Sequence, residues 1–221
     1  MGPHTLTLFV SLLATAVVVV VGTPVAWMLG RGPQTWRKRL VEMLILLPVV
    51  LPPTVVGYGL LLILGRGTTF GQWLNDSVGI QLLFTWQGAV IASAVMAFPL
   101  HVRTMIVAFS DIDASMIEQG KAFGASDWQI FKRIGLPIAS RGLGAGTALA
   151  FARAAGEFGA TLMVSGAIPG KTQTMPIALY ESVMAGKDSE AMLTALGLLS
   201  ITLVVVGFAT ILSLRRRPWE F

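Results

Sequence analysis

The chain has 221 residues, of which 54% are hydrophobic and only 12% are charged, and its net charge is +5. Soluble domains carry about 25% charged residues, so this composition excludes an ordinary soluble domain and indicates a protein with several membrane-spanning helices. The sequence has no cysteine, which excludes a disulfide framework and a cysteine-based metal site, and its basic residues do not form the basic and aromatic patch of a nucleic-acid-binding protein.

Five stretches predict an all-α integral membrane protein with one domain over residues 1–221. Four of them are uncharged and reach the roughly 20 residues that a helix needs to cross the hydrocarbon core. The fifth contains Arg141 and Arg153, but it repeats a small residue every four positions, which lets helices approach closely and predicts a helix buried in the bundle. This small-residue stripe is Gly142, Gly146, Ala150 and Ala154. The spans are expected at about 6–29, 43–64, 86–102, 134–156 and 191–214.

The second span contains Pro48, Pro52 and Pro53. Prolines remove backbone donors and kink helices, and membranes tolerate this where protein or a water-filled cavity satisfies the freed carbonyls. Two compatible interpretations follow, namely a bent helix that lines a translocation path and a kink with a purely structural role.

A polar segment at residues 113–133 is expected to form two short helices outside the membrane. Ser115 stands three residues before Glu118, and Ser126 three before Gln129, and both spacings fit a capping box. Gly124 lies between them at a natural helix end. The segment also carries more apolar side chains than a connector needs, namely Ile117, Phe123, Trp128 and Phe131.

Arg153 and Glu157 are four residues apart at the outer end of the fourth span, where they can pair on one helix face. One interpretation is a salt bridge that holds the helix end, and the other is an electrostatic element beside the path of an anion. In the loop that follows, a short helix is expected at about 176–185, and a half-inserted segment around 160–168 is left open.

No catalytic site, metal or cofactor is predicted. His4 and His101 are isolated, and the carboxylates are scattered. Residues 166–172 read GAIPGKT, but a phosphate-binding loop needs four residues between its glycines and this segment has three.

The basic residues predict the orientation of the chain. With five spans and the N-terminus outside, twelve of the sixteen basic residues fall on the inner side, including Arg216 and Arg217 near the C-terminus. Cytoplasmic segments carry the excess of Lys and Arg. The segment 113–133 and the C-terminus are therefore expected in the cytoplasm.

The segment Glu118–Pro137 resembles the EAA loop of the membrane subunits of ABC importers. That pattern is Glu-Ala-Ala, then three residues, Gly, nine residues, Ile, one residue and Leu-Pro. The chain departs from it at Gln119 and Gly120, which stand where the pattern has two alanines. The resemblance implies the fold of a type I ABC importer permease, in which this loop docks a separate ATPase. The docking residues it implies are Glu118, Gly120, Phe123, Gly124, Ala125, Trp128, Leu136 and Pro137.

Phe151–Tyr180 and Leu51–Leu61 resemble the corresponding segments of molybdate ABC-transporter permeases. The first holds the motif Gly-Glu-Phe-Gly-Ala-Thr at 156–161 and Ile-Pro-Gly-x-Thr-x-Thr-x-Pro at 168–176. The candidate path residues are Pro48, Pro52, Pro53, Arg153, Glu157, Phe158, Gly159 and Thr161.

This second resemblance implies a non-catalytic subunit of an importer for molybdate and also tungstate, in a bacterial or archaeal plasma membrane. Its implied partners are a second copy of the chain, a cytosolic ATPase dimer, a periplasmic or extracellular oxyanion-binding protein and membrane lipid. The alternatives are a permease for sulfate or another oxyanion and an ion-coupled secondary transporter. The uncharged spans disfavour coupling to protons, because such transporters place titratable groups near the membrane midplane.

Overall fold

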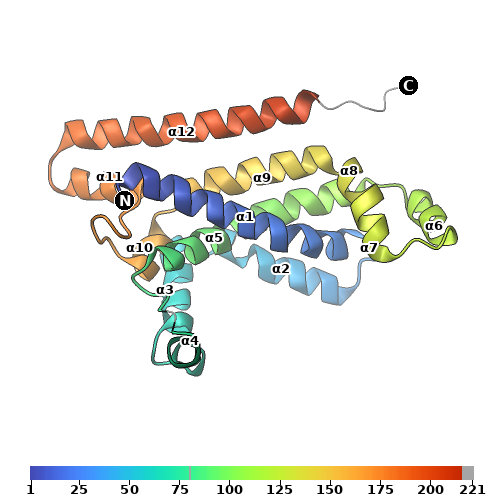
Figure 1. The fold of residues 1–221 in the computed structure, drawn as a ribbon, viewed down its shortest axis with the longest axis horizontal. Coiled ribbons are helices and arrows are strands. Elements are labelled where there is room, and N and C mark those ends of the chain that lie inside the picture. Colours follow the sequence, from blue (N-terminus) through green and yellow to red (C-terminus); the bar gives the residue numbers. More distant parts are fainter. Residues whose placement is uncertain (80, 216–221) are drawn as a thin grey trace.

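The computed structural model describes residues 1–79 and 81–215, and the regular elements in this part of the chain are helices (Figure 1). Three of them are long and apolar enough to cross a membrane, and they cover the stretches expected at 6–29, 86–102 and 191–214. They are α1 (Pro3–Gly30), α5 (Trp86–Ser110) and α12 (Asp188–Arg215). Arg216 and Arg217 lie outside the described residues.

The expected span at 43–64 is divided into two helices at its prolines, which is a sharper interruption than the predicted bend. It consists of α2 (Trp36–Val50) and α3 (Pro53–Leu64), whose axes are bent by 112°. Leu51 takes an extended conformation (φ −77°, ψ 146°) because a proline disfavours the helical region for the residue before it. Pro53 then occupies the first position of α3, where its missing N–H costs nothing, whereas Pro48 is accommodated inside α2.

The helix expected at 134–156 is also interrupted. It starts as a π-helical turn, η1 (Phe131–Gly135), continues through α8 (Leu136–Ile138) and becomes regular only in α9 (Ser140–Ala155). Pro137 lacks an amide N–H, so the regular hydrogen-bond ladder cannot run through it. Because α9 has only 16 residues and α2 and α3 qualify as a span only together, the count of five spans stays a prediction.

The remaining helices are short: α4 (Thr69–Val78), α6 (Ala114–Ala122), α7 (Asp127–Ile130), α10 (Gly159–Ser165) and α11 (Met175–Met184). α11 confirms the helix expected at about 176–185. α10 occupies the first part of the segment left open at 160–168, and most of its residues are buried.

The centre of the molecule is a bundle of α1, α5 and α9, with α12 along one side and α2 along the other (Figure 1). α6, α7 and α8 gather at one end of this bundle. The small-residue stripe allows the close packing: a Cβ atom added at Gly142 would lie 2.3 Å from Cβ of Ala108 on α5. Ala150 and Ala154 are buried against α1 and α5, so the prediction that this helix is buried in the bundle is confirmed.

A buried polar contact lies at the crossing of these three helices. His101 of α5 is fully buried, and its Nε2 lies 2.9 Å from Oγ1 of Thr23 on α1. A Cβ atom added at Gly146 of α9 would lie 3.0 Å from Nδ1 of the same ring. His101 therefore joins α1 to α5 and limits the size of the residue at position 146.

Candidate functional site

The cap of α6 differs from the expected one. Asp113, not Ser115, is its N-cap: the Asp113 carboxylate accepts the backbone N–H of Ser115 at 2.8 Å, so the prediction of a cap at Ser115 is wrong. This hydrogen bond from the Ser115 backbone lowers the pKa of the Asp113 carboxyl, because it favours the charged form. An acidic cap also suits the positive end of the helix dipole.

The cap of α7 is the predicted capping box. The Ser126 hydroxyl accepts the N–H of Gln129 at 3.3 Å, and the Gln129 side chain accepts the N–H of Ser126 at 2.8 Å. Both exposed amides are satisfied by the segment itself, so α7 begins at a residue fixed by local sequence.

Between these helices the chain reverses at Gly124, where φ is +79°, a conformation that favours glycine. Gly124 donates to the Lys121 carbonyl at 2.9 Å and Ala125 donates to the Gly120 carbonyl at 3.0 Å. This pair of bonds is the Schellman motif that closes a helix C-terminus. Gly124 therefore fixes the angle between α6 and α7, as the sequence predicted for a helix end.

Two large aromatic side chains protrude from this reversal. Phe123 is 90% exposed and Trp128 is 65% exposed, and Glu118 on α6 is exposed as well. Apolar side chains this open on a helix pair with fixed geometry form a surface suited to a protein partner.

The segment is attached to the bundle through buried aromatic residues. Phe131 is 5% exposed and lies between Trp128 and the bundle, with its ring centroid 5.3 Å from that of Trp128 and 5.4 Å from that of Trp27 on α1. Trp27 in turn contacts Phe109 of α5 at 5.0 Å. Ile130 is fully buried in the same cluster, against which Leu136 packs. Trp128 is thus in contact through Phe131 with residues of both α1 and α5.

Two glycines permit this attachment. A Cβ atom added at Gly135 would lie 2.6 Å from Cζ3 of Trp27, so only glycine fits there. A Cβ atom added at Gly120 would lie 3.3 Å from Cδ1 of Ile134 and 3.4 Å from Cγ1 of Ile130, a tight but milder contact. Sequence reasoning missed Gly135, because its partner Trp27 is distant in the chain and no local pattern marks the contact. Pro137 is exposed in α8.

The candidate path residues form a second cluster, at the opposite end of α9. Arg153 Nη1 lies 2.6 Å from Oε2 of Glu157, which confirms the predicted ion pair, with side-chain exposures of 27% and 1%. Glu157 follows the end of α9, and its Oε1 accepts the N–H of Ala160 at 2.7 Å. The carboxylate therefore joins the end of α9 to the start of α10, and it is paired and hydrogen-bonded as a buried charge requires.

The cluster is packed against the start of α3. A Cβ atom added at Gly159 would lie 3.1 Å from Cβ of Pro53. Thr161 is buried and its hydroxyl donates to the carbonyl of Phe158 at 2.9 Å, while the Phe158 ring contacts Tyr180 of α11 at 5.1 Å.

The structure therefore brings together six of the eight candidate path residues. Pro52 stands at the break before α3, and Pro48 lies inside α2. In residues 1–79 and 81–215, no group of three or more His, Cys, Asp or Glu side chains is placed to hold a metal ion.

The sequence is similar to that of known membrane transport subunits. It is 41% identical to the Molybdenum transport system permease protein ModB of Escherichia coli over 203 residues, which are 91% of this chain and 87% of that protein. It is 39% identical to the putative molybdenum transport system permease protein YvgM of Bacillus subtilis, over 93% of this chain and 90% of that protein. It is 35% identical to the Sulfate transport system permease protein CysW of Synechocystis, over 90% of this chain and 71% of that protein.

The fold is similar to that of a chain in a bacterial alginate ABC transporter, solved in complex with an alginate pentasaccharide-bound periplasmic protein. The TM-score is 0.74 at 17% sequence identity, and the match covers 96% of this chain and 77% of that one. This likeness confirms the predicted all-α fold of an ABC importer permease. Residues 22–218 match the family model described as the binding-protein-dependent transport system inner membrane component. The family expected from the Glu118 segment is thereby confirmed, and the chain belongs to the inner membrane components of binding-protein-dependent transport systems.

Proposed function

We propose that the chain is the membrane-spanning permease subunit of an ATP-driven importer for molybdate, with tungstate as a second solute. Molybdate is supported by the relatives from Escherichia coli and Bacillus subtilis, because both are named for molybdenum transport and this chain aligns with most of the length of each. A sulfate importer is the alternative, which the relative from Synechocystis favours at lower identity.

The observation that carries the proposal is the pair of exposed aromatic residues, Phe123 and Trp128, on helices whose ends are capped and whose base is buried against α1 and α5. A surface that receives force from a partner needs both an anchor for that partner and a rigid connection to the moving helices. The partner is a cytosolic ATPase dimer that hydrolyses ATP, and this chain itself catalyses no reaction.

The assembly contains two copies of the chain, so that two ATPase subunits meet two equivalent docking segments. The chain spans the plasma membrane five times, with the N-terminus outside and the C-terminus in the cytoplasm, which leaves the docking segment on the cytoplasmic side. A periplasmic or extracellular binding protein delivers the oxyanion, consistent with the family description. When ATP closes the ATPase pair, the Phe123 and Trp128 surface moves and turns the central cavity outward.

The path for the anion passes the cluster around Arg153 and Glu157. Arg153 keeps 27% of its side chain exposed while it pairs with Glu157, so its guanidinium retains donors for a second anion. A partly shared cation lowers the cost of bringing a dianion to the outer part of the membrane without holding it tightly.

Uptake into proteoliposomes tests the proposal. The chain is reconstituted with its ATPase and binding protein, and ATP-dependent accumulation of molybdate, tungstate and sulfate is compared. Molybdate and tungstate should accumulate, and vesicles without ATP or without the binding protein should stay empty. Accumulation of sulfate alone would favour the alternative, and uptake by this chain without any ATPase would contradict the importer mechanism.

A further inference from the structure

The attachment of α2 to the bundle differs from that of the other long helices. None of the residues of α2, all of which the structure describes, is buried, whereas α1 and α5 contribute many side chains to the core. Ile45 of α2 packs against the cluster around Val102 and Ile106, but its side chain is only partly buried there. α2 therefore lies on the bundle and is not embedded in it.

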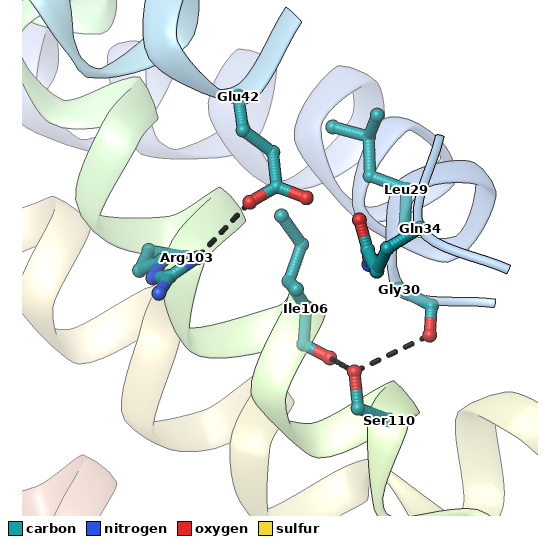
Figure 2. A network of polar contacts seen from close by, with 7 residues as sticks. All are labelled: Leu29, Gly30, Gln34, Glu42, Arg103, Ile106 and Ser110. Atoms are coloured by element: carbon teal, nitrogen blue, oxygen red, sulfur yellow. Dashed lines mark hydrogen bonds and ion pairs between the residues drawn. The ribbon is translucent and has the colours of Figure 1, made fainter. Parts of the chain in front are cut away.

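An ion pair supplies the polar part of this attachment. Glu42 Oε2 lies 3.1 Å from Nη1 of Arg103 on α5, with side-chain exposures of 17% and 56% (Figure 2). The other oxygen of Glu42 is buried and accepts no hydrogen bond from the described residues, and a cavity of about 10 Å³ lies beside the pair. An unsatisfied buried carboxylate oxygen carries a desolvation cost, so this contact is only partly optimised.

The contact between α1 and α5 at the same end of the bundle is built differently. A Cβ atom added at Gly30 would lie 2.9 Å from the carbonyl oxygen of Ile106, so the two backbones touch. Ser110 Oγ lies 2.8 Å from the Ile106 carbonyl oxygen and 3.2 Å from that of Gly30 (Figure 2). α1 thus packs on α5 backbone to backbone, while the contacts of α2 with α5 through Glu42 and Ile45 are made by side chains.

The helical hydrogen-bond ladder is interrupted between α2 and α3. Pro52 and Pro53 donate no backbone hydrogen bond, so no regular helical ladder continues from α2 into α3. α3 itself is fixed, because a Cβ atom added at Gly57 would lie 2.7 Å from Cα of Ala160 on α10. The torsions that the prolines leave open are φ and ψ of Leu51 and ψ of Pro52, within the extended range that a following proline allows, and a change in them moves α2 and leaves α3 in place.

We propose that Glu42 and Arg103 are a positioning pair for transport: they hold α2 against α5 in the conformation described here and separate when α2 swings about Leu51 and Pro52 during the cycle. The inference rests on the proposed transport function. Both residues lie one position outside the predicted spans 43–64 and 86–102, at the cytoplasmic boundary. Water can therefore hydrate both charges once they part, which keeps the separated state accessible.

Thiol cross-linking tests the separation. Because the chain has no native cysteine, the reagents can react in it only with the cysteines that are introduced. The Glu42→Cys/Arg103→Cys variant, with its ATPase and binding protein in proteoliposomes, is treated with a short and with a long bis-methanethiosulfonate reagent. The short bridge should abolish uptake, and reduction or the long bridge should restore it. Each single-cysteine variant, treated with the same reagents, controls for simple modification. Uptake by the short-bridged protein at the rate of its reduced form would overturn the inference.

A second readout does not depend on the solute. The yield of the short bridge should fall when a non-hydrolysable ATP analogue is added with the ATPase, because the two positions move apart. An equal yield in every state would overturn the inference, whereas failure of the wild-type assembly to take up any oxyanion would contradict only the proposed function.

Charge exchange tests the pair without cysteines. Glu42→Gln should reduce uptake while the ATPase still co-purifies, and the Glu42→Arg/Arg103→Glu variant should recover it. Two outcomes would show that the pair has no positioning role. One is uptake by the Glu42→Gln variant at the wild-type rate, and the other is uptake by the Glu42→Arg/Arg103→Glu variant no faster than by Glu42→Gln.

Discussion

The ring of Trp128 lies 5.3 Å from that of Phe131, so a side chain that is 65% exposed is in direct contact with one that is 5% exposed. Phe131 continues this contact to Trp27 and Phe109, which belong to the two longest helices of the central bundle. The aromatic residues therefore connect the exposed surface of Phe123 and Trp128, which is proposed to dock the ATPase, to the bundle by side-chain packing. Packed interiors transmit displacement because they have low compressibility.

Phe123→Ala is expected to weaken or uncouple the ATPase. Large aromatic anchors at interfaces often contribute about 2 kcal/mol or more on truncation. Because Phe123 is 90% exposed, its removal should leave the thermal stability of the permease unchanged. Co-purification of the ATPase and ATP-dependent uptake are the measurements, and normal values of both would contradict the docking role.

Gly124→Val is expected to have the same effect by a different route. The φ of +79° is costly for a residue with a side chain, so the angle between α6 and α7 should change. Gly124→Asn is the matched control, because asparagine tolerates this conformation better than most residues. The Asn variant should retain more uptake than the Val variant, and equal loss in both would indicate that the backbone angle is not the cause.

Gly135→Ala is expected to destabilise the base of the docking segment. The added Cβ would lie 2.6 Å from the Trp27 ring, and overpacking of this kind typically costs about 1–3 kcal/mol. Gly120→Ala is the control, since its Cβ would lie no closer than 3.3 Å to Ile134 and 3.4 Å to Ile130, and Ala suits a helix better by about 0.5–1 kcal/mol. Thermal unfolding in detergent distinguishes them: Gly135→Ala should unfold at a lower temperature than Gly120→Ala.

The features that the sequence predicted correctly depend on neighbours a few residues apart. The capping box of Ser126 and Gln129 and the turn at Gly124 are local, and both form as expected. The cap of α6 was assigned to Ser115 because its spacing to Glu118 fits a capping box. Asp113 caps the helix with its carboxylate alone, without a partner at the third position, and so leaves a weaker pattern in the sequence.

The features that the sequence did not predict depend on contacts between distant segments. The prolines predicted a kink, but the bend of 112° leaves α3 packed through Gly57 on α10, and nothing near residue 57 marks that partner. The small-residue stripe likewise predicted close packing without naming the neighbouring helix. The contacts of Gly142 with Ala108 and of Gly146 with His101 identify that neighbour as α5.

Gly146→Leu is expected to force α9 away from α5. Even a Cβ atom at this position would lie 3.0 Å from Nδ1 of His101, and a larger side chain should cost roughly 1–3 kcal/mol. Gly207→Leu on α12 is the matched control, because no atom lies within 4 Å of a Cβ added there. Dimer yield and thermal stability in detergent are measured. A Gly146 variant as stable as the Gly207 variant would contradict the close packing.

The last prediction separates the two interpretations of the Arg153–Glu157 pair. Arg153→Gln leaves the Glu157 carboxylate buried without its cation, and breaking a buried pair in this way costs about 3–5 kcal/mol. This variant should therefore unfold at a lower temperature and take up molybdate more slowly, whichever interpretation is correct.

The Arg153→Gln/Glu157→Gln variant decides between them. It removes both charges, and the new amide oxygen at position 157 can still accept the N–H of Ala160, as Oε1 does now at 2.7 Å. The thermal stability should therefore recover most of what the single variant loses. If Arg153 also assists the anion, uptake should stay low although the fold is restored and the ATPase still binds. Recovery of uptake together with stability would show that the pair only joins α9 to α10 and takes no part in conducting the solute.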